Sequence, residues 1–167
     1  MLDIFLAVLL AFVAGFVVKI VDWIDDEKEG KYVIKWPLAI VYGILIGYLI
    51  SQASFSTLFL AALFAQVFAL KIDTHTHVLG FAFAMLSLFW FGFPQVDYLL
   101  FILFTVLAFL DEIEFVGRFL WLTEHRVVLL AGSAVFITFG RFDYFVGILA
   151  FDIGYLLFEW IAQKYMK

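Results

Sequence analysis

Long apolar runs, separated by short polar segments, follow one another along the whole chain. They contain mostly Leu, Ile, Val, Ala and Phe and lack the period-two alternation of membrane barrel strands. Seven runs have the composition of membrane helices: Ile4–Ile20, Trp36–Ser51, Phe55–Leu70, Val78–Phe93, Val96–Leu110, Val127–Phe139 and Tyr144–Ile161. We therefore expect an all-α, polytopic integral membrane bundle of about seven transmembrane helices, with six as the alternative, in a single domain covering residues 1–167.

The sixth run is the doubtful one. Its 13 residues fall short of the roughly 20 that usually span a bilayer. Either the helix starts earlier, near Phe119, which places Glu124–Arg126 inside the membrane, or Glu112–Leu122 forms a short interfacial segment with Trp121 at the headgroups. We favour the second interpretation.

The composition agrees with a membrane protein. Apolar residues make up 66% of the chain and charged residues only 15%, with a mean hydropathy of +1.11, whereas a soluble domain is about half apolar and a quarter charged. A soluble chain of 19.2 kDa leaves about a third of its surface exposed and has no room to hide this much apolar surface. The composition therefore excludes a soluble enzyme, a disordered protein and a nucleic-acid-binding protein. It predicts a multi-pass protein of the cell membrane.

Three absences add detail. The chain has no Cys, so it forms neither disulfides nor thiolate metal sites. It has no Asn and only three Met, which fits the avoidance of thermolabile residues in a hyperthermophile, although depletion of polar residues in lipid would also lower Asn. Asp3 and no basic residue precede the first run, so we expect that run to stay as a transmembrane helix and not to act as a signal peptide.

Basic residues lie almost entirely on one side of the predicted membrane. With seven helices, one side holds Arg141 alone. The other side holds nine basic residues: Lys19, Lys28, Lys31, Lys35, Lys71, Arg118, Arg126, Lys164 and Lys167. Because cytoplasmic loops are enriched in Lys and Arg, we expect the N-terminus outside and the C-terminus in the cytoplasm.

The acids and histidines are concentrated on the same side, which the positive-inside rule does not explain. Only Asp3, Asp97 and Asp143 fall outside, whereas eleven acids and all three histidines are cytoplasmic. The cytoplasmic acids and histidines are therefore candidates for a metal-binding or catalytic site.

The first cluster follows the first apolar run. If the helix continues beyond Ile20, then Lys19, Asp22 and Asp26 share one face, with Asp25 beside Asp22. Carboxylates at this spacing repel unless a cation lies among them, and hard ions such as Mg²⁺, Ca²⁺ or Mn²⁺ suit carboxylate oxygens. The alternative is a solvated, charged loop.

The second cluster lies between two apolar runs and contains Lys71, Asp73, His75 and His77. Imidazole binds transition metals or carries protons near neutral pH, so these residues are candidate metal ligands. The alternative is that Asp73 or Thr74 caps the next helix and that the histidines lie at headgroup level.

The third cluster, Asp111 and Glu112, closes the fifth run. Negative charge at a helix C-terminus opposes the helix dipole, so we expect a cationic partner there. Solvated acids are again the alternative.

The last apolar run contains a carboxyl group at membrane depth. Asp152 precedes Ile161 by nine residues and therefore lies about 13 Å from the inner end of the helix. It shares a face with Tyr155 and Glu159. Intramembrane carboxyls usually face the bundle interior and serve a function. The alternative is a protonated, structural Asp152 hydrogen-bonded to another helix, on which Gln66 is one candidate partner.

The leading hypothesis is a membrane enzyme with a cytoplasm-facing acid and histidine site. It would hold one or two divalent metal ions, Mg²⁺, Mn²⁺ or Zn²⁺, and act on a lipid-linked phosphate as a hydrolase or transferase. The predicted catalytic residues are Asp22, Asp73, His77, Asp111, Glu112 and Asp152. The predicted metal ligands are Asp22, Asp25, Asp26, Asp73, His75, His77, Asp111 and Glu112. The predicted contacts to the substrate phosphate are Lys19, Lys71 and Arg126.

Two other function classes stay open. One is a small-cation or proton transporter or channel that uses Asp152 and Glu159. The other is a membrane assembly or binding subunit whose acids meet a basic partner. Membrane lipid is an expected partner in every case.

Overall fold

The computed structural model describes residues 2–27, 32–93, 95–113 and 127–165. This part of the chain consists of helices joined by short connections, and no strand occurs in it. The α-helices are α1 (Leu2–Glu27), α2 (Lys35–Ser51), α3 (Ser56–Phe68), α4 (His75–Phe91), α5 (Tyr98–Glu112), α7 (Val127–Val135) and α8 (Phe142–Tyr165). The 3-10 helix η2 (Phe136–Phe139) follows α7 directly. The prediction of an all-α fold is confirmed.

Each apolar run corresponds to a helix, but several boundaries were wrong. α1 continues past Ile20 to Glu27, so Asp22, Asp25 and Asp26 lie on a helix and not in a loop. α5 ends with Asp111 and Glu112, the two acids predicted to close it. α4 begins at His75 and therefore carries both histidines of the second cluster. The polar clusters are thus held on helix ends, where their directions are fixed.

Helix length separates two helices from the others. α1 over Ile4–Asp26 and α8 over Phe142–Tyr165 are long and apolar enough to cross a membrane. At about 1.5 Å per residue, α1 with its 26 residues reaches about 39 Å and α3 with its 13 residues about 20 Å. By length and composition, two of the described helices, rather than seven, could cross a membrane. The interfacial segment predicted near Trp121 lies outside the described residues.

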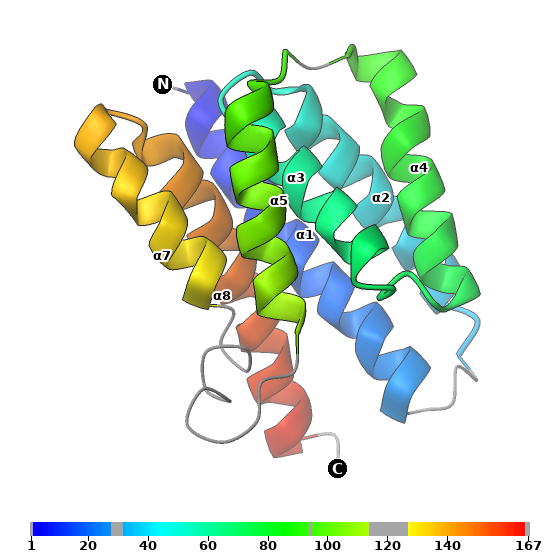
Figure 1. The fold of residues 1–167 in the computed structure, drawn as a ribbon. Coiled ribbons are helices and arrows are strands. Elements are labelled where there is room, and N and C mark those ends of the chain that lie inside the picture. Colours follow the sequence, from blue (N-terminus) through cyan, green and yellow to red (C-terminus); the bar gives the residue numbers. More distant parts are fainter. Residues whose placement is uncertain (1, 28–31, 94, 114–126, 166–167) are drawn as a thin grey trace.

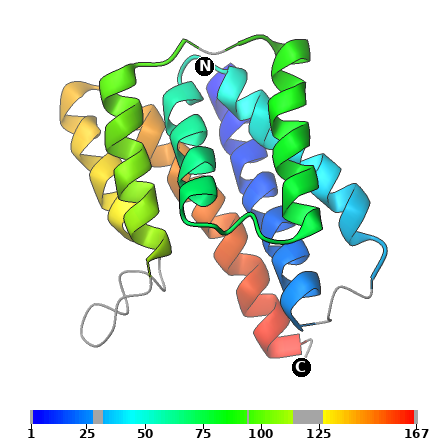
Figure 2. The same cartoon turned by 45° about the vertical axis from the view of Figure 1, so that its right-hand side comes forward.

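Successive helices run in alternating directions, so that α1 begins and α8 finishes at opposite ends of the bundle (Figures 1 and 2). α1 packs along α8 and α2, α2 along α4, and α3 along α5, while α7 contacts α5 and α8. We call the end at which α1, α3, α5 and α8 finish the polar end. The other end, at which α2 and α4 finish, is called the opposite end.

α1 and α8 approach each other backbone to backbone because each has a glycine where they cross. A Cβ atom at Gly15 would collide with the carbonyl group of Phe151, and one at Gly154 with the carbonyl group of Phe12. Ala11 on α1 is fully buried. Small residues on these helices therefore serve contacts inside the bundle.

Large buried side chains fill the half of the bundle nearer the opposite end. They include Leu49, Ile50, Phe55, Leu58, Leu88, Phe104 and Tyr144. The rings of Phe104 and Tyr144 meet edge to face, with their centroids 5.0 Å apart, an arrangement that aromatic pairs favour. This half is a packed core, whereas the polar end contains a cavity.

Candidate functional site

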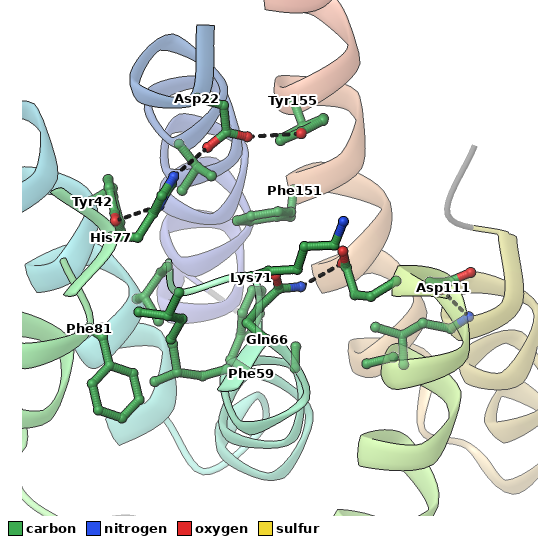
Figure 3. Close-up of a pocket in the computed structure, with 18 of the residues that line it drawn as sticks. Asp22, Tyr42, Phe59, Gln66, Lys71, His77, Phe81, Asp111, Phe151 and Tyr155 are labelled. Atoms are coloured by element: carbon green, nitrogen blue, oxygen red, sulfur yellow. Dashed lines mark hydrogen bonds and ion pairs between the residues drawn. The ribbon is translucent and has the colours of Figure 1, made fainter. Parts of the chain in front are cut away.

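A pocket of about 380 Å³ opens at the polar end of the bundle (Figure 3). Its volume lies within the roughly 300–1,000 Å³ of small-molecule sites. The polar residues that line it are Asp22, Asp26, Tyr42, Gln66, Lys71, Asp73, Thr74, His77, Asp111, Glu112, Asp152 and Tyr155. The apolar residues that line it are Val18, Ile46, Phe59, Ala62, Leu63, Ile72, Phe81, Ala108, Leu129, Ile148 and Phe151. All six residues predicted as catalytic are therefore brought to one pocket.

The pocket exists because the helices around it differ in length. α3 ends at Phe68, and residues 69–74 then cross the mouth of the pocket before α4 begins. α1 and α8 continue beyond this level (Figure 2), and Asp22 on α1 and Tyr155 on α8 line the pocket. Side chains from two long helices and one short connection thus face a common space.

A hydrogen-bonded chain of side chains borders the pocket. Asp22 Oδ1 lies 3.3 Å from His77 Nε2, and His77 Nδ1 lies 3.3 Å from the Tyr42 hydroxyl (Figure 3). On the other side, the Tyr155 hydroxyl donates to Asp22 Oδ2 at 2.9 Å and accepts from Lys19 Nζ at 3.2 Å. Four helices, α1, α2, α4 and α8, are therefore connected through Asp22.

Both nitrogens of His77 are occupied by neighbouring side chains. A neutral imidazole carries one donor and one acceptor, and Asp22 and Tyr42 match these two positions. His77 therefore orients the carboxylate of Asp22, and it is not aimed at a ligand in the pocket. Asp22 is the member of the chain that presents charge to the cavity.

Lys19 belongs to the same chain. It contacts the Tyr155 hydroxyl, lies 3.8 Å from Glu159 Oε2, and sits 4.5 Å from the centre of the Tyr155 ring. Lys19 does not line the pocket itself. Its predicted role as a phosphate contact is thus replaced in this geometry by a role in holding Tyr155.

Asp25 was predicted as a metal ligand, but it points to another partner. Its Oδ1 accepts a hydrogen bond of 2.6 Å from Lys35, and its Oδ2 accepts one of 2.9 Å from Thr74. The Thr74 hydroxyl also accepts from the backbone N–H of His77 at 3.2 Å. Thr74 is therefore the cap of α4, one of the two residues anticipated for that position. Asp25 ties this cap to the start of α2, and its side chain is only 6% exposed, which excludes the solvated loop.

Asp111 has a partner that sequence reasoning did not name. Its two carboxylate oxygens accept hydrogen bonds from the backbone N–H groups of Val128 and Leu129, at 2.9 and 2.8 Å. These groups form the first turn of α7, where the helix dipole is positive. The end of another helix thus supplies two hydrogen-bond donors to the carboxylate of Asp111. This is a capping role.

Glu112 and Asp152 also line the pocket. Gln66, one of the candidate partners named for Asp152, donates a hydrogen bond of 2.5 Å to Glu112 Oε1. Asp152 is 6% exposed. It faces the bundle interior, as the prediction for an intramembrane carboxyl required.

The predicted metal centre is assembled only in part. Among the described residues, no group of three His, Asp or Glu side chains is close enough to hold a metal ion. His75 is exposed at the start of α4 and does not line the pocket. Asp26 and Asp73 line it near its exposed mouth. Arg126 lies outside the described residues.

Sequence reasoning missed Tyr42. This residue lies in the middle of an apolar run, 5% exposed, and its hydroxyl is the second partner of His77. Space for its ring comes from Gly80 on α4, where a Cβ would collide with Tyr42. The available signal was a phenol in the middle of a run that is otherwise almost entirely apolar.

Comparison of the chain with models of protein families, with curated proteins and with solved structures finds no match. The function of the pocket is therefore inferred from its own residues.

Proposed function

We propose that the chain is an integral membrane protein in which the seven described α-helices lie within the bilayer. The length and apolar composition of α1 and α8 support this. Large apolar side chains exposed on the shorter helices also support it, among them Phe89 at 76%, Trp90 at 88% and Leu99 at 81%. Exposed apolar patches of this size mark contact with lipid or a partner. The short α3 is shielded by its neighbours, with Leu58, Ala61 and Ala65 fully buried.

The same proposal places the polar end in the cytoplasm. Four of the five basic residues that the structure describes lie toward that end, namely Lys19, Lys35, Lys71 and Lys164, and Arg141 is the exception. Trp36 and Trp160 are half exposed near the polar end, as tryptophans of a membrane interface are. Lys164 lies 4.7 Å from the ring of Trp160. A cytoplasm-facing pocket follows from this orientation.

The pocket suits an amphiphile better than a water-soluble metabolite. Apolar side chains such as Phe59, Leu63 and Phe81 line the pocket together with charged ones, among them Asp22 and Lys71. We propose that the head of the amphiphile is a phosphate accompanied by a divalent cation, because six carboxylates line the pocket and would repel an anion that arrived alone. This combination of apolar and charged side chains in one pocket is the observation on which the proposed function rests.

A magnesium ion is compatible with the absence of a three-residue cluster in the described chain. Mg²⁺ keeps several waters and is commonly bound by one or two carboxylates together with substrate phosphate oxygens. Asp22 and Asp26 lie one helical turn apart on α1, and both line the pocket. In this proposal they hold the cation through direct or water-mediated contacts, while Lys71 contacts a phosphate oxygen. When bound, the cation would offset the charge that develops during phosphoryl transfer or hydrolysis.

The alternative of a cation or proton channel has less support. Asp152 lines the pocket, but the bundle beyond it is filled by Leu58, Phe104 and Tyr144. An ion would have to cross this packed apolar half, at a high cost in desolvation. The geometry therefore favours a pocket entered from one side.

Binding of dodecyl phosphate in non-ionic detergent tests the proposed function. We expect dodecyl phosphate to bind the purified protein in the presence of Mg²⁺ and to bind at least about tenfold more weakly in EDTA, a difference of about 1.4 kcal/mol. Asp22→Asn should weaken the Mg²⁺-dependent binding by at least the same factor of about ten. Isothermal titration calorimetry measures both quantities.

The matched control is Asp97→Asn. Asp97 is also an aspartate at a helix end, but its carboxylate caps α5 at the opposite end of the bundle, where it accepts from Leu99 and Leu100. We expect the Asp97→Asn variant to bind dodecyl phosphate with the affinity of the unmodified protein. Equal binding with and without Mg²⁺, or no binding at all, would contradict the proposal.

A further inference from the structure

The wall of the pocket between α3 and α4 differs from its other walls. These two helices follow each other in the chain and are joined only by residues 69–74. Both are fully described, yet α3 packs along α5 and α4 along α2, with little packing between them. Figures 1 and 2 both show α4 standing apart from α3, with α2 passing behind α4. α3 and α4 thus both line the pocket without packing closely against each other.

The side chains at this wall are apolar. Ile46 from α2, Leu63 from α3 and Phe81 from α4 all line the pocket. The ring of Phe81 lies on the side of the pocket away from Asp22 and His77 (Figure 3). Val78, three residues before Phe81 on α4, is 51% exposed. Apolar residues therefore line the pocket between α3 and α4 and continue along α4 to an exposed position.

We infer that the gap between α3 and α4 is a lateral portal that holds the hydrocarbon chain of the amphiphile. The inference rests on the proposed function, since the head must occupy the pocket for its chain to lie in the portal. Hydrocarbon is the occupant that the lining selects. A polar chain would leave its groups without hydrogen-bond partners against Ile46, Leu63 and Phe81, and a chain in the surrounding lipid can enter sideways without crossing water.

Photolabelling with an alkyl phosphate that carries a diazirine at the end of its chain tests this inference. The protein is reconstituted with Mg²⁺, irradiated and digested, and the labelled peptides are identified by mass spectrometry. We expect the labelling that unlabelled dodecyl phosphate suppresses to map to α3 and α4, around Leu63 and Phe81. Labelling that is not suppressed reports contact with bulk lipid.

A variant that fills the portal sharpens the test. Leu63→Trp should reduce the suppressible labelling by at least about tenfold, the equivalent of about 1.4 kcal/mol, and Phe81→Trp serves as a second filled variant should the first fail to fold. The matched control is Leu86→Trp, which places the same side chain at a position on α4 that is 58% exposed. This control should label as the unmodified protein does.

The outcomes separate the portal from the proposed function. Suppressible labelling that maps between another pair of helices, or that persists in both filled variants, overturns the portal while leaving an amphiphile site in place. Absence of suppressible labelling from every peptide contradicts the proposed function and the portal with it. Suppressible labelling at α3 and α4 that the filled variants lose supports both.

Discussion

The two ends of the bundle use the same residue types in different ways. At the opposite end, Arg141 donates to both carboxylate oxygens of Asp143 at 3.0–3.2 Å, and its guanidinium lies 4.1 Å from the ring centre of Tyr144. Hydrogen bonding to Asp143 raises the pKa of Arg141 above its usual value. At the polar end, Asp22 faces a pocket while its neighbours hold it in place.

The difference lies in what surrounds each carboxylate. Asp143 is 8% exposed, and its partner Arg141 lies only two residues away in the sequence. Asp22 is connected to residues on three other helices and lines a cavity of about 380 Å³. A buried aspartate is thus structural when a local partner matches it. It becomes a candidate for function when distant elements orient it toward open space.

Asp111 is the residue that tests how far this contrast holds, because it lies at the polar end but caps α7. We expect Asp111→Ala to lower the free energy of unfolding by about 3 kcal/mol, because two backbone N–H groups lose their acceptors at about 1–3 kcal/mol each. Chemical denaturation in detergent, followed by circular dichroism, measures this. A loss of dodecyl phosphate binding without a loss of stability would place Asp111 with Asp22 and break the distinction.

The next largest effect on stability is expected from the same substitution, Asp to Asn, made separately at Asp143 and at Asp22. Asp143→Asn should lower the free energy of unfolding by about 1–3 kcal/mol, because a charge-assisted pair with Arg141 is lost, and should leave binding of dodecyl phosphate unchanged. Asp22→Asn should cost less than about 1 kcal/mol, since an amide oxygen still accepts from Tyr155. Chemical denaturation measures the stability of both variants, and calorimetry measures their binding of dodecyl phosphate. Equal losses of stability would mean that Asp22 and Asp143 do not differ in their structural role.

Tyr42→Phe gives the smallest effect. Removing its hydroxyl deletes one hydrogen bond to His77 and should lower the free energy of unfolding by about 0.5–1.5 kcal/mol. Tyr98→Phe is the control, because Tyr98 is 80% exposed and its substitution should change nothing measurable by thermal unfolding. If Tyr42→Phe is also neutral, the chain of hydrogen bonds ends at His77 and does not include α2.

The helices were largely predictable from the sequence. Apolar runs with no strand-like alternation specify helices through local hydrophobicity and backbone hydrogen bonding alone. Their ends were less predictable. α1 continues through Asp22, Asp25 and Asp26 because the partners that stabilise these acids, such as Lys35 and Tyr155, come from other elements.

The site was predictable as a set of residue types but not as an arrangement. Clustering of acids at loops that are distant in sequence correctly indicated that Asp22, Asp73 and Asp111 gather at one end. It did not indicate that Asp111 caps a helix, and it gave no reason to include Tyr42. A cap needs the position of another backbone, which the sequence pattern does not contain.

By itself, then, the sequence determined that this chain forms apolar helices and that its charges collect at one end, because both properties depend on the local order of residues. Only the tertiary structure decided which charges meet. Tyr155 lies 133 residues from Asp22 and Tyr42 lies 35 residues from His77, and these contacts arise because glycines let the helices pack closely enough. The functional geometry of the pocket is therefore a property of helix packing, whereas its chemical composition is a property of the sequence.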